Sequence, residues 1–141
     1  MSSVLDFAKQ FLKTPYKLGS LDPKEGLDCA TFVLYFFKEL DGKDLKIDYP
    51  PNVFDRYAAD TASKVYEYYI QQCLTLKRYP CQVDLLDILV FNEKERHSQH
   101  VGIVIADNLF IHCGPNGVEI HKTSLCKKNL LYVGKFKEGV R

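Results

Sequence analysis

The chain has 141 residues, of which 46% are hydrophobic and 26% are charged, and its formal net charge is +1. This size and composition are typical of one globular domain with a single core, which we expect to span residues 1–141. The charge is too small and too scattered to predict a nucleic-acid partner. No apolar run approaches the ~18 residues that cross a bilayer, and the N-terminus lacks the pattern of a secretory signal, so no membrane partner is expected.

The cysteines and histidines limit the site chemistry. Five cysteines occur without regular spacing, namely Cys29, Cys73, Cys81, Cys113 and Cys126. Their odd number excludes a complete disulfide framework. The sequence contains no CxxC pair, so a structural zinc site is not expected. His97 and His100 have a spacing that suits metal ligands on a helix, but their segment has the pattern of a loop that enters a strand. We expect mostly reduced thiols, no metal and no cofactor.

The first half of the chain has helical patterns. A helix is predicted from Ser2 or Ser3 to about Lys13, and the following Thr14-Pro15 pair ends it. A second helix begins after Asp28, whose side chain can cap it, and ends at Asp41-Gly42. Residues 52–77 again have helical spacing, with a break near 59–63, and their tyrosines and Arg56 could wall a pocket.

The second half has the pattern of strands joined by turns. Short apolar or alternating runs are predicted as strands at 88–91, 100–105, 109–113, 118–121 and 130–133. Asp107-Asn108 and the Gly114-Pro115-Asn116-Gly117 run supply the turns between three of them. Helices followed by a meander of strands predict an α+β fold in which N-terminal helices pack on an antiparallel sheet.

Cys29 stands at the head of the second predicted helix, in its first turn. Unpaired N–H groups and the helix dipole favour a thiolate there. His100 and His112 lie on two successive predicted strands and could supply a base and an orienting group. A plain two-residue turn would place His112 opposite Ile103, on the other face from His100, so a bulge or a different turn pairing is needed to bring both onto one face.

Five ordered motifs resemble the NlpC/P60 family of papain-like cysteine peptidases. They are PYKLG at 15–19, LDCATFV at 27–33, DILVF at 87–91, HVGIVI at 100–105 and FIH at 110–112. The resemblance covers about residues 4 to 134 and implies a papain-like α+β fold. It implies Cys29 as the nucleophile, His100 as the general base and His112 as the residue that orients the base.

The resemblance also implies how the substrate is held. Tyr16 matches a tyrosine whose hydroxyl the family places near the oxyanion, and the backbone N–H of Cys29 is a further donor. Asp28, Ala30 and Thr31 complete the expected oxyanion and substrate-binding group. The family usually has Ser-Gly after the nucleophile, so Ala30 and Thr31 together with residues 52–77 bear on substrate choice.

The function implied by the resemblance is hydrolysis of an amide bond through a Cys29 acyl-enzyme, with a peptidoglycan stem peptide or muropeptide as substrate. One alternative is an amidase or acyltransferase that acts on a small molecule or lipid. Another is a non-catalytic binding module on the same fold. Without a signal sequence, we expect a chain that is cytoplasmic as synthesised or is delivered to the cell wall by a phage or secretion route. The sequence gives no indication of oligomeric state.

Overall fold

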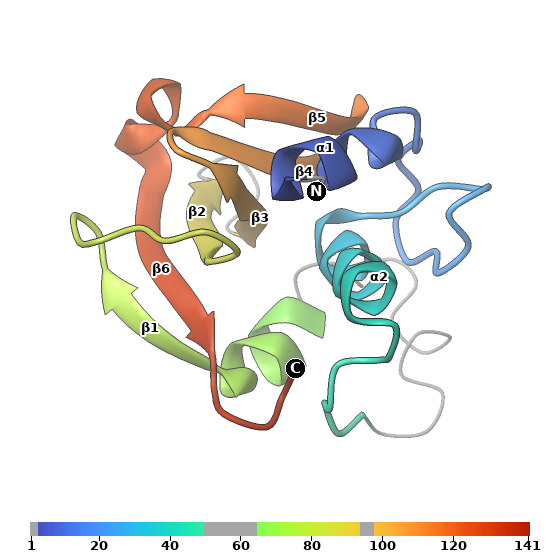
Figure 1. Cartoon of the computed structure of the whole chain (residues 1–141), viewed down its shortest axis with the longest axis horizontal. Coiled ribbons are helices and arrows are strands. Elements are labelled where there is room, and N and C mark those ends of the chain that lie inside the picture. Colours follow the sequence, from blue (N-terminus) through green and yellow to red (C-terminus); the bar gives the residue numbers. More distant parts are fainter. Residues whose placement is uncertain (1–2, 50–64, 94–97) are drawn as a thin grey trace.

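The computed structural model describes residues 3–49, 65–93 and 98–141, and it consists of short helices on one side of a curved sheet (Figure 1). The helical elements are α1 (Val4–Ala8), η1 (Lys9–Phe11), α2 (Cys29–Asp41), η2 (Tyr66–Ile70), η3 (Gln71–Cys73), η4 (Thr123–Leu125) and η5 (Lys127–Asn129). The strands are β1 (Leu74–Arg78), β2 (Ile88–Glu93), β3 (Ser98–Ala106), β4 (Leu109–Gly114), β5 (Gly117–Lys122) and β6 (Leu130–Phe136). This confirms the predicted α+β class.

The sheet has six strands in the order β1-β6-β2-β3-β4-β5, and every neighbouring pair is antiparallel. Strands β2 to β5 form the predicted meander. Strand β6 differs, because it returns across the molecule to lie between β1 and β2. The sheet therefore has two edges, β1 and β5, and β3 and β4 are interior strands paired on both sides.

Strand β1 corrects the helical prediction for residues 74–77. Leu74 is buried and Leu76 half-buried, whereas Thr75 and Lys77 are exposed, which is the two-residue alternation of a strand. Pairing with β6, from Leu74 opposite Phe136 onward, provides the backbone hydrogen bonds. The helical spacing before it persists only as the short turns η2 and η3. The predicted break near 59–63 and the residues Arg56 and Tyr57 lie outside the described residues.

Helix α2 has its predicted ends. Asp28 is its N-cap, and Asp28 and Thr31 form a reciprocal capping box. Gly42 ends the helix in the left-handed conformation, where its N–H donates to the carbonyl of Lys38. The first helix is shorter than predicted: Ser3 caps it, and after Ala8 it tightens into the 3-10 turn η1.

The main core lies between the helices and one face of the sheet. Phe11 of η1 packs edge-on against Phe7, Phe32 and Tyr35, with ring centroids 5.4, 5.8 and 5.6 Å away. Alternate residues of β3, including Ile103 and Ile105, face this core. A smaller apolar cluster covers the opposite face of the sheet and is made of Leu89, Phe91, Val104, Phe110, Leu130 and Val133.

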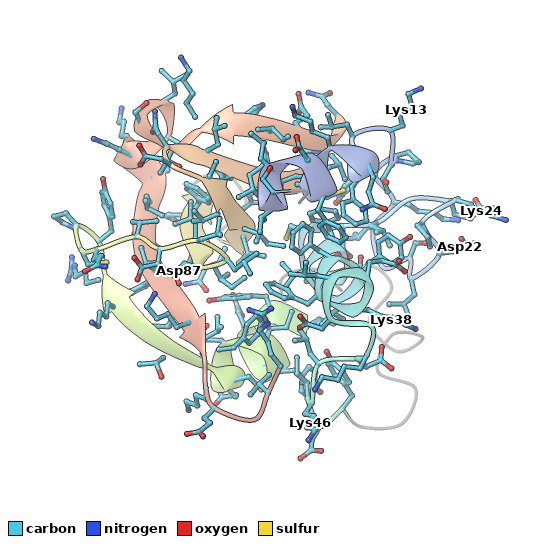
Figure 2. The ribbon with its side chains drawn as sticks, viewed as in Figure 1. Lys13, Asp22, Lys24, Lys38, Lys46 and Asp87 are labelled. Atoms are coloured by element: carbon cyan, nitrogen blue, oxygen red, sulfur yellow. The ribbon has the colours of Figure 1, made fainter. Side chains whose placement is uncertain are left out.

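Asp87 anchors the start of β2. Its buried carboxylate accepts hydrogen bonds from Lys135 Nζ of β6, at 2.7 and 3.0 Å, and from the backbone N–H of Asp84 at 2.8 Å. Asp87 lies on the sheet side of the molecule, whereas labelled lysines such as Lys13 and Lys24 project from the opposite side, around α2 and the loop before it (Figure 2). Because β2 pairs with β3, this ion pair also fixes the strand that carries His100.

Among the described residues, none of the helices combines the length and the apolar character needed to pass through a bilayer.

Candidate active site

The N-terminus of α2 is held by one fully buried carboxylate. Asp28 Oδ1 accepts from the backbone N–H of Ala30 at 3.0 Å and of Thr31 at 2.8 Å, and from Thr31 Oγ1 at 3.1 Å. Asp28 Oδ2 accepts from the N–H of Gly19 at 2.9 Å, which ties the preceding loop to the helix. Asp28, Ala30 and Thr31 thus form the helix cap, and their contact with a substrate stays a prediction.

Cys29 is the first residue of α2 and is only 6% exposed. Tyr66 of η2 is fully buried and lies close enough to Cys29 for the two side chains to interact electrostatically. The pKa of Tyr66 is well above its usual value, mainly because of burial and further because of the nearby Glu67 and Cys29. The Tyr66 hydroxyl has no hydrogen-bond partner among the described residues. The sequence assigned Tyr66 only to a possible pocket wall, because its approach to Cys29 depends on packing between distant segments.

Strand β4 is bonded to the loop that leads into α2. Cys113, the residue after His112, donates from its buried thiol to the carbonyl of Leu27 at 3.0 Å. Burial chiefly raises the pKa of this thiol to about 12, so it stays protonated. Leu27 in turn pairs with the segment around half-buried Tyr16 in a short parallel bridge. The backbone therefore brings the Tyr16, Cys29 and His112 segments into one region.

A bulge between β3 and β4 sets the register of the histidines. Ala106 pairs with Leu109, but further along Val104 pairs with Phe110, so Ile105 is the extra residue. This is the irregularity that the sequence required and could not place. It shifts the pairing by one residue, so that His112 shares a face with His100 instead of lying opposite Ile103.

Three histidines from adjacent strands form a connected row on that face. His100 Nε2 lies 2.7 Å from His112 Nδ1, and their rings meet edge to face with centroids 4.9 Å apart. His112 Nε2 lies 3.3 Å from His121 Nδ1 of β5. His121 Nε2 lies 3.6 Å from the carboxylate of Glu119, which is the residue directly opposite His112. His121 is half-exposed and lies beside His112.

His112 is neutral at physiological pH. Its pKa falls to about 3, first because of burial and then because of the neighbouring His100 and His121, with Glu119 acting weakly in the opposite direction. A neutral imidazole has one N–H donor and one acceptor nitrogen. His112 can therefore donate to one histidine neighbour and accept from the other.

Aromatic packing holds the histidine row in place. Phe110 lies beside His112 and His121, with ring centroids 5.1 and 6.2 Å away, and beside Phe91 at 5.0 Å. Gly102 makes this packing possible, because a Cβ there would come within 2.7 Å of the Phe110 ring and 3.2 Å of the Ile111 carbonyl. The glycine between His100 and Val104 is therefore a requirement of the site.

A cavity of about 550 Å³ runs along one side of α2, beginning at Thr31. Its lining is partly apolar and includes Leu34, Tyr35, Leu45, Ile47 and Tyr49. Thr31 thus borders this cavity and also belongs to the helix cap. Among the described residues, no three His, Cys, Asp or Glu side chains are arranged to hold a metal ion.

Comparison with known proteins agrees with the resemblance read from the motifs. A family model described as the NlpC/P60 family matches residues 13–134. The murein DD-endopeptidase MepH of Escherichia coli K12 is 28% identical over 117 residues, which are 82% of this chain and 37% of MepH. This chain therefore spans much less than two thirds of that curated relative.

Two solved structures share the fold. The NlpC/p60 domain of the peptidoglycan hydrolase SagA superposes with a TM-score of 0.59 and 20% identity, over 95% of this chain and 97% of that one. A Staphylococcus aureus protein, described as similar to a lipoprotein of the NLP/P60 family, gives a TM-score of 0.57 and 20% identity over 96% and 41% of the two chains. The predicted papain-like α+β architecture is confirmed.

Proposed function

Because this chain belongs to the NlpC/P60 family, we propose that it is a thiol hydrolase that cleaves an amide bond in a peptidoglycan stem peptide. The names of two similar proteins, a murein DD-endopeptidase and a peptidoglycan hydrolase, support this substrate class. Cys29 is the proposed nucleophile, His100 the general base and His112 the residue that orients His100.

In the proposed reaction, the Cys29 thiol first gives its proton to His100, and the resulting thiolate attacks the amide carbonyl carbon and forms a C–S bond. The carbonyl oxygen becomes an oxyanion, to which the backbone N–H of Cys29 and the Tyr16 hydroxyl donate. Collapse of this intermediate breaks the C–N bond, and His100 gives its proton to the leaving amine. A water molecule, deprotonated by His100, then hydrolyses the thioester and restores the thiol.

The observation that carries the proposal is the 2.7 Å contact between His100 Nε2 and His112 Nδ1. A base that passes protons to and from a thiol needs one ring nitrogen free and the other held in a fixed hydrogen bond. The contact engages Nε2 of His100, and in the proposed reaction Nδ1 of the same ring exchanges the proton with Cys29. The hydrogen bond from Cys113 to Leu27 supports the assignment, because it ties the strand of His112 to the loop before Cys29.

Mass spectrometry of a muropeptide mixture tests the proposal. New fragments are expected with the wild type and not with Cys29→Ala, and their masses identify the bond. Cys126→Ala is a matched control, because it removes a half-buried thiol from the second apolar cluster and should leave cleavage in place. Equal cleavage by wild type and Cys29→Ala would contradict the nucleophile assignment. If the wild type cleaves nothing but its Cys29 is reactive, small-molecule or lipid amides and esters are the next substrates to test. If Cys29 is also unreactive, a binding module is favoured.

A further inference from the structure

The histidine row does not end at His112. His112 uses both ring nitrogens, since Nδ1 meets His100 Nε2 at 2.7 Å and Nε2 meets His121 Nδ1 at 3.3 Å. His121 then presents its own Nε2 to Glu119 Oε2 at 3.6 Å. The first two contacts join adjacent strands on one face of the sheet, and the third joins residues two apart on β5, so the arrangement follows from the strand pairing.

We propose that His121 and Glu119 are positioning residues that extend the His100–His112 pair into a relay ending on a surface carboxylate. This inference rests on the proposed function, because it concerns how His100 is made a base for the Cys29 thiol. The residues that face His112 with titratable groups are His100 from β3 and His121 and Glu119 from β5.

Glu119 gives the relay a direction. The Glu119 carboxylate lies 3.6 Å from His121 Nε2, beyond hydrogen-bond distance, and its negative charge favours the His121 tautomer with its hydrogen on Nε2. The Nδ1 of that tautomer is an acceptor, and it requires the hydrogen of His112 to lie on Nε2. The Nδ1 of His112 is then also an acceptor and requires a hydrogen on His100 Nε2. The nitrogen left unprotonated is His100 Nδ1, which is the base that the reaction needs.

The relay also helps to stabilise the positive charge that His100 acquires. When His100 takes the thiol proton it becomes an imidazolium, and a neutral histidine stabilises that cation less well than a carboxylate does. His112 is held neutral, since burial and its histidine neighbours lower its pKa to about 3. Polarisation of His112 through His121 toward Glu119 supplies part of the missing negative charge.

The ring nitrogens can be tested without any substrate. In the ¹⁵N spectrum of His112 and His121 at pH 7, Nε2 is expected to carry the hydrogen and Nδ1 to be unprotonated, in the wild type and equally in Cys29→Ala. In His121→Phe, which keeps a ring against Phe110, the Nε2–H signal of His112 should lose its hydrogen-bond shift. A hydrogen on Nδ1 of either histidine, or no change in His121→Phe, would overturn the relay even if Cys29 proves unreactive.

The pH profile of Cys29 alkylation by iodoacetamide, resolved by peptide mass spectrometry, tests the effect on reactivity. Glu119→Gln and His121→Phe are expected to lower the alkylation rate at the acidic and neutral end of the profile, because less thiolate is present when the His100 imidazolium is less stable. At basic pH, where the thiol ionises without that cation, the rates should converge. Both substitutions should lower the rate at pH 7 by about 3- to 10-fold, well below the ~10⁴ that loss of a directly bonded orienting carboxylate costs. His121→Gln should recover most of the rate, because a carboxamide can accept from His112 and donate to Glu119.

Glu138→Gln, which removes the same charge from a remote exposed position near the C-terminus, is the matched control and should follow the wild type. Superimposed profiles for wild type, Glu119→Gln and His121→Phe would overturn the relay and leave the proposed function standing. Failure of the proposed function has a different signature, namely a wild-type Cys29 that reacts no faster at pH 7 than an ordinary thiol.

Discussion

At the scale of single residues, Tyr66 carries a buried hydroxyl that finds no hydrogen-bond partner in the part of the chain that the structure describes, which is an unfavourable arrangement. Removal of this hydroxyl in Tyr66→Phe is expected to raise the free energy of unfolding by about 1 kcal/mol, because a buried polar group that gains nothing is deleted. Urea unfolding monitored by circular dichroism measures this change. Tyr132→Phe, at a half-exposed site nearby, is the control and should change stability by less than ~0.5 kcal/mol. A less stable Tyr66→Phe would mean that the hydroxyl is bonded in solution.

Some residues of the candidate site could be predicted from neighbouring residues in the sequence, and others could not. Asp28 and Cys29 were predicted from neighbours in sequence, because a cap and the turn after it are defined within four residues. His100 and His112 were singled out by an ordered motif. His121 and Tyr66 were not placed at the site, because their positions there depend on contacts between segments that no local pattern records.

At the scale of elements, the packing between β3 and β4 depends on Gly102. A methyl group at this position would meet the Phe110 ring at 2.7 Å, so the ring or the strands must move. Gly102→Ala is expected to lower stability by about 1–3 kcal/mol. Because Phe110 packs on His112, the variant should also slow Cys29 alkylation at pH 7.

Gly114→Ala on β4 is the matched control for this substitution. A Cβ at Gly114 would lie at an ordinary 3.8 Å from the nearest atoms of His112, so thermal unfolding should change little. If Gly102→Ala and Gly114→Ala have the same melting temperature, the tight packing at Phe110 is not the reason for the glycine in β3.

Element type was predictable wherever a segment carries its own periodicity, as in α2 and in β2 to β5. Strand β1 was missed because Leu74 and Leu76 follow directly on a helical pattern, and only pairing with β6 decides their conformation. The bulge at Ile105 was recognised as necessary but could not be located. Its position depends on which pairing between β3 and β4 buries the two apolar faces best, and this is a property of the assembled sheet.

At the scale of the whole molecule, the neutral His112 makes folding sensitive to acid. Its pKa is about 3 in the folded protein and 6.5 in an ordinary exposed histidine. Between these values the unfolded chain binds a proton that the folded chain does not, so stability falls as the pH falls. The full contribution is present above about pH 6.5 and is lost progressively toward pH 3, by up to ~1.4 kcal/mol per pH unit.

Urea unfolding at pH 7.5, 6, 5 and 4 measures this loss, and His112→Asn separates it from other groups. Asparagine also offers a neutral donor and acceptor but does not titrate. The hydrogen bond from Arg141 is the main reason that the pKa of Asp41 is low. The stability that this carboxylate contributes is lost in acid in both proteins. The wild type is therefore expected to lose more stability than His112→Asn between pH 6.5 and 4. Parallel curves would mean that His112 takes up its proton in the folded state near its ordinary pKa. The row of histidines would then be open to solvent, and a relay that needs a neutral His112 would operate only at higher pH.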